Sequence, residues 1–143
     1  MSCACNWDEL RKLQGRGIEI GCHAVSHIRL ASATPTRLAF EVREGRRLLE
    51  SKLGRCSAFA YPYGTADAHS EATTQALAEA GFELAFLTHS DFSGTDTDRY
   101  LIPRITMPDH VMSLPEYRAR VGGAGVPIRK ARTFLDGVRN SAR

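Results

Sequence analysis

The sequence predicts an α/β domain with parallel strands, and three observations lead to this prediction. Apolar residues recur at helical spacing in some segments and form short continuous runs in others. The two patterns alternate along the 143 residues, and glycine or proline punctuates them. Such alternation is typical of βα units, whose strands pair in parallel. This length fits one domain of modest size.

The first half of the chain is expected to hold two helices and two strands. The apolar spacing predicts a short helix at residues 7–14 and a brief strand at 18–20. A longer helix begins at Pro35, because proline is favoured in a first helical turn, and ends before Gly54. Residues 57–61 form a buried strand. The charged residues of the long helix are expected to form a solvated face: Arg37, Glu41, Arg43, Glu44, Arg46, Arg47 and Lys52.

The second half is expected to continue the alternation. A helix is predicted at 70–80, strands at 82–87 and 101–107, and a helix at 113–120. A glycine-rich break then separates this part from a basic helical tail at 126–143. A solvated tail helix is favoured over a site for an acidic partner.

Composition excludes several classes of function. The net charge is only +3 and both signs are mixed along the chain, so neither nucleic acid nor a membrane surface is an expected partner. No apolar run approaches the ~18 residues that a membrane-spanning helix needs. The first residues lack the pattern of a signal peptide, so the chain as written is expected in the cytoplasm. A longer, envelope-associated form is the alternative.

Two histidines four residues apart follow the first expected strand. His23 and His27 follow the run that ends at Gly21, and one helical turn there would place both rings on the same side. Neutral imidazole is the commonest protein ligand for Zn²⁺ and similar ions. We therefore expect this pair to bind a divalent metal, with Zn²⁺ as the first choice. The alternative is a pair of histidines with ordinary surface or core contacts.

A second motif follows the strand at 57–61. The C-terminal ends of parallel strands form the active face of α/β architectures, and Tyr61, Pro62 and Tyr63 stand at such an end. Beside a metal, the Tyr63 backbone N–H, held by Pro62, becomes an oxyanion donor. The alternative is a turn with aromatic packing. Arg104 stands between apolar neighbours and is expected to need an anionic partner, either in a structural ion pair or in an orienting role.

The four cysteines are expected to be reduced thiols. Cys3 and Cys5 lie near the N-terminus, and Cys22 and Cys56 are expected to be buried as small apolar residues. Their spacing does not match paired C-x-x-C elements. A rival interpretation is a small redox or zinc-binding module built on Cys3, Cys5, Cys22 and His23.

In these motifs the chain resembles the NodB-homology polysaccharide deacetylases, family 4 of the carbohydrate esterases. The resemblance runs from about Trp7 to Val121. Its segments are residues 17–21 followed by His23-x-x-x-His27, then 44–54, 59–64, 80–85 and 102–105. The resemblance implies a distorted (β/α)₇ barrel, here partial and without its N-terminal βα units. Residues 1–125 would form this incomplete domain, and 126–143 the tail.

The resemblance also implies a chemistry. Family members hydrolyse acetyl groups of carbohydrate polymers, most often N-acetyl groups, with O-acetyl groups as the alternative. A divalent metal, usually Zn²⁺, is bound by an aspartate and two histidines, here His23 and His27. The backbone N–H of Tyr63 would help to hold the oxyanion, and Tyr61 and Pro62 would line the substrate site. Arg104 would supply a positive charge in place of the family's third-motif arginine.

One departure from the family pattern limits these expectations. The first motif, Thr-Phe-Asp-Asp-Gly, carries both the aspartate ligand and the general base, and this sequence does not contain it. We expect weak metal binding and impaired deacetylation for the chain alone. The alternatives are an inactive remnant or subunit that binds carbohydrate or a partner chain, and a partner that supplies the missing N-terminal strands.

Overall fold

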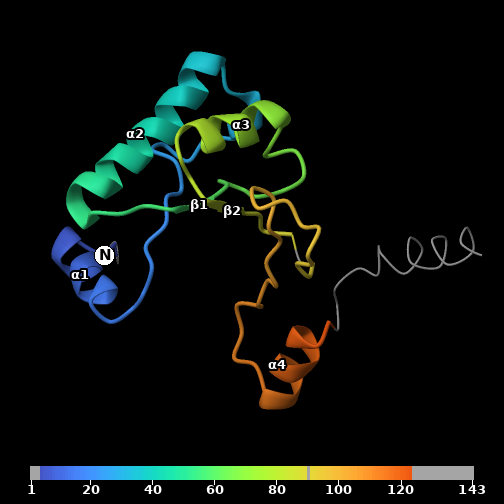
Figure 1. Ribbon diagram of the computed structural model, residues 1–143. Coiled ribbons are helices and arrows are strands. Elements are labelled where there is room, and N and C mark those ends of the chain that lie inside the picture. The colour runs from blue at the N-terminus through green and yellow to red at the C-terminus, as the bar shows by residue number, and fades with distance from the viewer. Residues whose placement is uncertain (1–3, 90, 124–143) are drawn as a thin grey trace, which may run out of the picture.

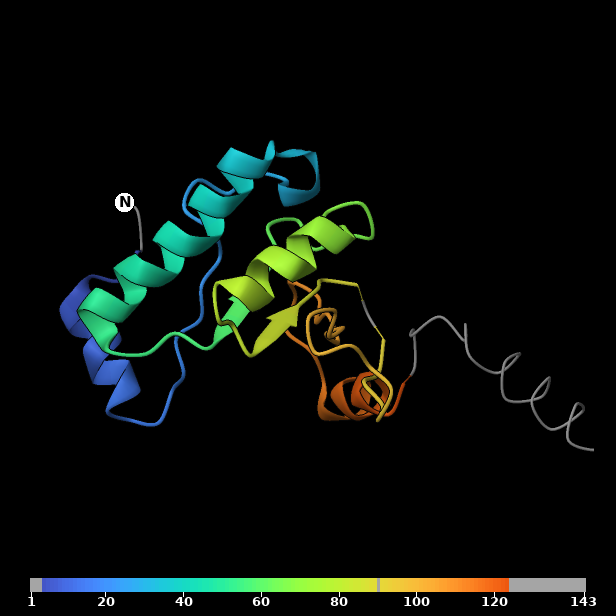
Figure 2. The same ribbon diagram turned by 45° about the horizontal axis from the view of Figure 1, so that its top comes forward.

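The protein is a mixed α/β structure with a small parallel sheet, and a computed structural model describes residues 4–89 and 91–123. Its elements in chain order are α1 (Trp7–Gln14), the 3₁₀ turn η1 (Leu30–Ser32), α2 (Pro35–Leu53), β1 (Ala58–Ala60), α3 (Glu71–Glu79), β2 (Leu84–Phe86) and α4 (Leu114–Val121). Helices α2 and α3 lie together on one side of the strands, α1 lies beside the C-terminal end of α2, and α4 lies well apart from α1 (Figures 1 and 2). The predicted α/β class with parallel strands is confirmed.

The predicted helices are confirmed with nearly the expected bounds. Before α2, the Thr34 side chain accepts a hydrogen bond from the Arg37 N–H at 3.4 Å, and Pro35 occupies the first turn. Gly54 ends the helix with φ +85°, a conformation that side chains rarely adopt. These caps explain why the bounds of this helix could be predicted from local sequence.

The strands are shorter than predicted, and the strands predicted at 18–20 and 101–107 are wrong. In place of the first strand, Cys22 forms a single parallel bridge to Phe59 two residues further on. In the second segment, Ile102 forms a single parallel bridge to Phe86. Strand length depends on pairing with neighbours rather than on local propensity. One bridged residue therefore lies beside β1 and the other beside β2, at the two edges of the sheet.

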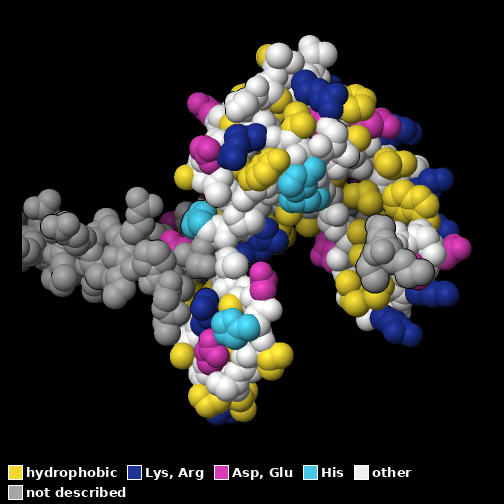
Figure 3. Space-filling model, turned by 180° about the vertical axis from the view of Figure 1, so that it is seen from behind, with side chains coloured by type: hydrophobic (Ala, Val, Ile, Leu, Met, Phe, Trp, Pro, Cys, Tyr) yellow, Lys and Arg dark blue, Asp and Glu magenta, His cyan; other side chains and the backbone are white. Residues whose placement is uncertain are grey.

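The two faces of the sheet separate core from solvent. Cys22, Phe59 and Ala85 are aligned by the parallel register, and all three are buried on the side of α2 and α3. Because side chains alternate along extended backbone, their neighbours face the other way. Residues of that second face line a cavity of about 340 Å³: Glu19, Gly21, His23, Ala58, Ala60 and Phe86. Figure 3 shows a hollow in the surface between the part that carries α1 and the part that carries α4.

The core lies between the sheet and helices α2 and α3. Phe59 packs edge-on against Tyr61 and Phe82, with ring centroids 5.6 and 5.3 Å apart. Leu38 and Val42 of α2 are buried against it, as the helical spacing predicts. The predicted solvated face of α2 is wrong at one position, because Glu41 is fully buried.

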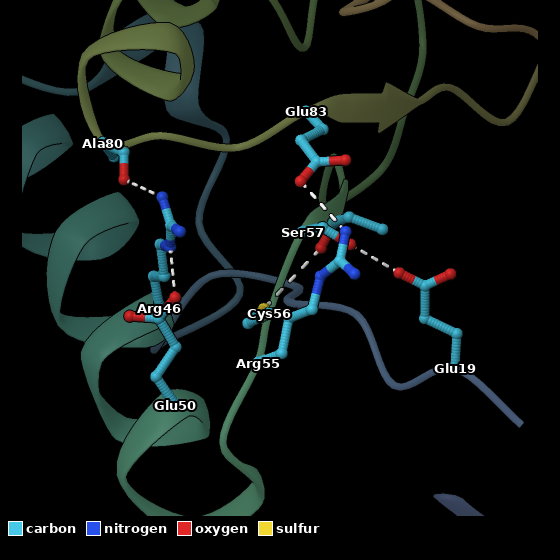
Figure 4. Close-up of polar contacts among 9 residues, drawn as sticks. Glu19, Arg46, Glu50, Arg55, Cys56, Ser57, Ala80 and Glu83 are labelled. Carbon is cyan, nitrogen blue, oxygen red and sulfur yellow. Dashed lines mark hydrogen bonds and ion pairs between the residues drawn. The ribbon is translucent and has the colours of Figure 1, made fainter.

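Polar contacts tie the elements together at the start of β1 (Figure 4). The Ser57 hydroxyl donates to the Glu19 carboxylate at 2.6 Å, which fastens the segment before Cys22 to the strand. From α2, the Arg46 guanidinium donates to the Ala80 carbonyl, which follows α3. The first bond holds the edge segment at the start of β1, and the second joins the two covering helices to each other.

Two expectations concern the ends and the exterior of the molecule. The basic tail predicted at 126–143 lies outside the described residues. Within the described residues, no helix combines the length and the apolarity that crossing a membrane requires.

Replacing Gly45 by alanine should destabilise the protein. A Cβ at Gly45 would lie 2.8 Å from the buried Cys22 Sγ, closer than side chains tolerate. Helix propensity alone would favour alanine by about 1 kcal/mol. We expect crowding to reverse this sign and lower the free energy of unfolding by about 1–3 kcal/mol. Urea unfolding measures it, and in a Cys22→Ala background the same substitution should no longer destabilise. A stabilising Gly45→Ala in the wild-type background would contradict this packing.

Candidate functional site

The ends of the paired segments bring two histidines and a tyrosine together. His23 directly follows the Cys22 bridge, and Tyr63 follows β1. The rings of His23 and His27 have centroids 5.0 Å apart, and the rings of His27 and Tyr63 are also 5.0 Å apart. The predicted convergence of the two motifs at one end of the sheet is therefore present as geometry.

A hydrogen bond fixes the orientation of His23. Its Nδ1 lies 2.7 Å from the Ala60 carbonyl oxygen, and a carbonyl only accepts, so Nδ1 carries the proton. The neutral ring then has its lone pair on Nε2. Metal-binding histidines are held in this way by a partner on the other ring nitrogen. His23 thus has the tautomer that a metal ligand needs.

The loop between the two histidines is not a helical turn, which was the condition for their spacing to place both rings on the same side. Ala24 has φ +62° and His27 has φ +54°, so both adopt left-handed backbone conformations. Non-glycine residues in this region cost of order 1–3 kcal/mol each. The rings approach each other through this strained loop, and contacts from elsewhere must hold it.

A buried carboxylate on α2 binds the middle of this loop. Glu41 Oε2 accepts hydrogen bonds from the backbone N–H groups of Val25 and Ser26 at 2.8 and 2.9 Å. Its Oε1 accepts the Ser26 hydroxyl and lies 2.6 Å from Arg37 Nη2. Burial alone would raise the pKa of Glu41, but the Ser26 and Val25 hydrogen bonds and the Arg37 charge outweigh it and lower the pKa below its usual value. Glu41 is therefore a buried anion in which both carboxylate oxygens accept hydrogen bonds and one also pairs with Arg37.

The turn after β1 presents a backbone donor. Tyr63 has φ +65°, its carbonyl accepts the Thr88 hydroxyl at 2.7 Å, and its ring is about half exposed. Gly64 follows with φ +59°, and its carbonyl accepts the Thr88 N–H at 2.9 Å. Within residues 4–89 and 91–123, no oxygen accepts the Tyr63 N–H. Among the described residues, this N–H is therefore a donor without an acceptor, in the residue whose ring contacts His27.

The arginine beside this turn is Arg29, which the sequence analysis missed. Its guanidinium lies 4.9 Å from the centroid of the Tyr63 ring. It is also paired with Asp67 at 2.7 Å and bonded to the Thr65 hydroxyl at 3.2 Å. Arg29 therefore links the histidine loop to the turn after β1. Its only sequence signal was its position two residues after His27.

The structure does not give three other predicted site residues the surroundings that their roles would need. Arg104 is exposed, and its Nε donates to the Leu87 carbonyl at 2.6 Å, so it does not need the anionic partner that the sequence analysis expected. Tyr61 has no exposed surface, and its hydroxyl has no hydrogen-bond partner among the described residues. Burial raises the pKa of this hydroxyl. Pro62 is also fully buried. Neither Tyr61 nor Pro62 offers a surface to a substrate here.

The described residues fit part of a metal site. His23 and His27 supply two imidazoles, whereas catalytic zinc sites have three protein ligands. Among the residues that the structure describes, no group of three or more histidine, cysteine or acidic side chains is placed to hold an ion. Cys22 is buried against α2 beside Gly45, on the opposite face from His23, so the cysteine-based module gains no support.

Comparisons with known proteins identify the family of the chain. A family model described as polysaccharide deacetylase matches residues 3–85. A putative polysaccharide deacetylase of Bacillus subtilis, YxkH, is 21% identical over 99 residues, which are 68% of this chain and 34% of that protein. The match therefore spans about a third of that curated relative.

Solved structures at low sequence identity share the fold. The Streptococcus pyogenes deacetylase PplD in complex with acetate has a TM-score of 0.66 at 22% identity, over 72% of this chain and 45% of that one. IcaB from Ammonifex degensii has a TM-score of 0.60 at 23% identity, over 84% of this chain and 52% of that one. The likeness thus covers about half of each solved chain.

The charge on Glu41 should make stability depend on pH in the acid range. Folding lowers the pKa of Glu41. The ionised carboxylate therefore stabilises the protein fully at a pH above the pKa in the unfolded chain, about 4.3. This stabilisation is lost as the pH falls through the pKa in the folded protein. We expect wild type to lose more stability than Glu41→Gln between about pH 7 and about pH 3. Urea unfolding at each pH measures this difference. An equal acid loss in the two proteins would contradict the burial of a charged Glu41.

Proposed function

The chain belongs to the polysaccharide deacetylase family, and from this membership we propose that it forms the histidine half of a metal-dependent site that removes acetyl groups from a carbohydrate polymer. N-acetyl groups are the proposed target. The observation that carries this proposal is the convergence of His23, His27 and the Tyr63 turn at one end of the parallel sheet. The paired segments would be part of a distorted (β/α)₇ barrel.

His23 and His27 would hold the metal. The bond from His23 Nδ1 to the Ala60 carbonyl leaves its Nε2 free for this purpose. When bound, a divalent metal, with Zn²⁺ favoured by imidazole ligands, supplies Lewis acidity toward an acetyl carbonyl. The cavity beside His23 opens on the face of the sheet away from the core.

The Tyr63 backbone would stabilise the negative charge that develops on the acetyl oxygen. Its N–H has no acceptor within the described residues, and the buried Pro62 before it restricts the turn. A donor held in place before the reaction needs no reorganisation during it. Arg29 lies over the Tyr63 ring, and its ion pair with Asp67 ties this turn to the histidine loop. The role of Arg104 remains a prediction, whereas no substrate contact is proposed for Tyr61, which is fully buried.

The number of ligands sets the expected strength of the site. Two histidines leave a catalytic zinc site one protein ligand short, and the described residues offer neither a third ligand nor a general base beside them. We therefore propose that a further segment or a partner chain completes the site. The same ligand count supports a second candidate function, a subunit that binds carbohydrate without hydrolysing it.

Metal titration tests the first part of this proposal. Isothermal titration of the full chain with Zn²⁺ should show weak binding that His23→Ala and His27→Ala each reduce about tenfold or more, because each removes one of two ligands. His110→Ala is the matched control, because His110 is exposed and pairs with Glu116 at 3.3 Å, outside the site. Equal Zn²⁺ affinity in all four proteins would contradict the metal site.

Product release tests whether the site of the chain alone is incomplete. The purified chain with Zn²⁺ should release little acetate from chitooligosaccharide, because the described residues place neither a third ligand nor a base beside the two histidines. Oligosaccharide binding without acetate release would support the binding subunit. Robust acetate release that depends on His23 and His27 would contradict the proposed incompleteness of the site.

A further inference from the structure

We propose that Glu41 is the positioning residue of this site: its buried carboxylate holds the loop from His23 to His27 in the conformation in which both imidazoles can bind one divalent cation. This inference rests on the metal site proposed above. Glu41 touches neither histidine in the described structure; it acts through the loop residues between them.

The contacts of Glu41 converge on the middle of the loop. One carboxylate oxygen accepts two successive backbone N–H groups, from Val25 and Ser26, and the other accepts the Ser26 hydroxyl. Hydrogen bonds to an ionised acceptor are about twice as strong as neutral ones. A single side chain from α2 thus fixes two consecutive peptide groups directly before His27.

The loop needs such an anchor because its conformation is strained. Ala24 and His27, on either side of the two anchored residues, both have positive φ. Without the carboxylate, the Val25 and Ser26 N–H groups would lose their partner, and the loop would be free to relax to ordinary backbone angles. Relaxation at either residue would turn one imidazole relative to the other.

Arg37 keeps the anchor charged and rigid. Its Nη2 lies 2.6 Å from Glu41 Oε1 and donates to the Ser26 hydroxyl oxygen at 2.6 Å. A buried carboxylate is tolerated only when it is paired and hydrogen-bonded, and Glu41 meets both conditions. The three side chains form a closed network over one edge of the loop.

A purely structural role for Glu41 would predict a different result. In that case its loss would lower global stability, and metal affinity of the folded protein would stay the same. A positioning role predicts a local change: the Val25 and Ser26 amides lose protection and the Zn²⁺ affinity falls in protein that remains folded. Partners of the ligand shell typically change metal affinity by about 10–100-fold when they are removed.

The experiment compares wild type with Glu41→Gln and Glu41→Asp as full chains. Glu44→Gln is the matched control, because Glu44 lies one turn further along α2 and pairs with Arg47 at 2.6 Å, away from the loop. Amide hydrogen exchange of Val25 and Ser26 is measured without metal, and Zn²⁺ affinity is measured by titration. Circular dichroism and urea unfolding confirm that each variant is folded at the temperature used.

We expect Glu41→Gln to speed exchange at Val25 and Ser26 and to weaken Zn²⁺ binding about tenfold or more, with Glu41→Asp in between and Glu44→Gln unchanged. If Glu41→Gln does not fold, Ser26→Ala, which removes one contact of the carboxylate, should weaken Zn²⁺ binding in the same direction by a smaller factor. Wild-type exchange and affinity in folded Glu41→Gln, or wild-type affinity in Ser26→Ala when Glu41→Gln cannot be measured, would overturn the proposal.

The two readouts separate this proposal from the function on which it rests. If wild type binds no Zn²⁺ but Glu41→Gln still exposes the Val25 and Ser26 amides, the metal site fails and the anchoring of the loop stands. If wild type binds Zn²⁺ through His23 and His27 and Glu41→Gln changes neither readout, the metal site stands and the positioning role fails.

Discussion

The parallel register that aligns Cys22, Phe59 and Ala85 is the constraint on which the rest of the structure depends. These three residues are buried under α2 and α3, so the residues beside them must face the other way. His23 is one of those neighbours, and its ring reaches the Ala60 carbonyl next to the cavity. A slip of one residue would bury His23 in the core and expose Cys22.

A second constraint acts on the loop from His23 to His27, which begins at the edge of the sheet. The sheet places the beginning of the loop, but the left-handed angles at Ala24 and His27 do not follow from pairing with β1. They depend on the buried carboxylate of Glu41, which reaches the loop from α2. The site is thus held from two directions, by the sheet edge at His23 and by the covering helix before His27.

Local sequence predicted those parts of the fold that local chemistry decides. The bounds of α2 follow from Thr34, Pro35 and Gly54, and the parallel pairing follows from the alternation of helices and strands. The strand predicted at 101–107 shrank to a bridge at Ile102, because strand length depends on neighbours that a single sequence does not reveal.

The site was predicted only where a motif marks it. The approach of His23 and His27 followed from their spacing, although the backbone between them is not helical. In the sequence, Glu41 is one of the charged residues of an amphipathic helix. Helical periodicity alone does not indicate that this carboxylate is buried and accepts two N–H groups of a distant loop. Arg29 was missed because its partner Tyr63 lies far away in the sequence.

X-ray absorption at the zinc edge of the full chain loaded with Zn²⁺ tests the central claim most directly, because it counts and identifies the atoms around the ion. The account predicts two imidazole nitrogens at about 2.0 Å, with the remaining ligands being oxygen, and one imidazole fewer in His27→Ala. Sulfur ligands at about 2.3 Å, or a spectrum that His27→Ala leaves unchanged, would contradict it.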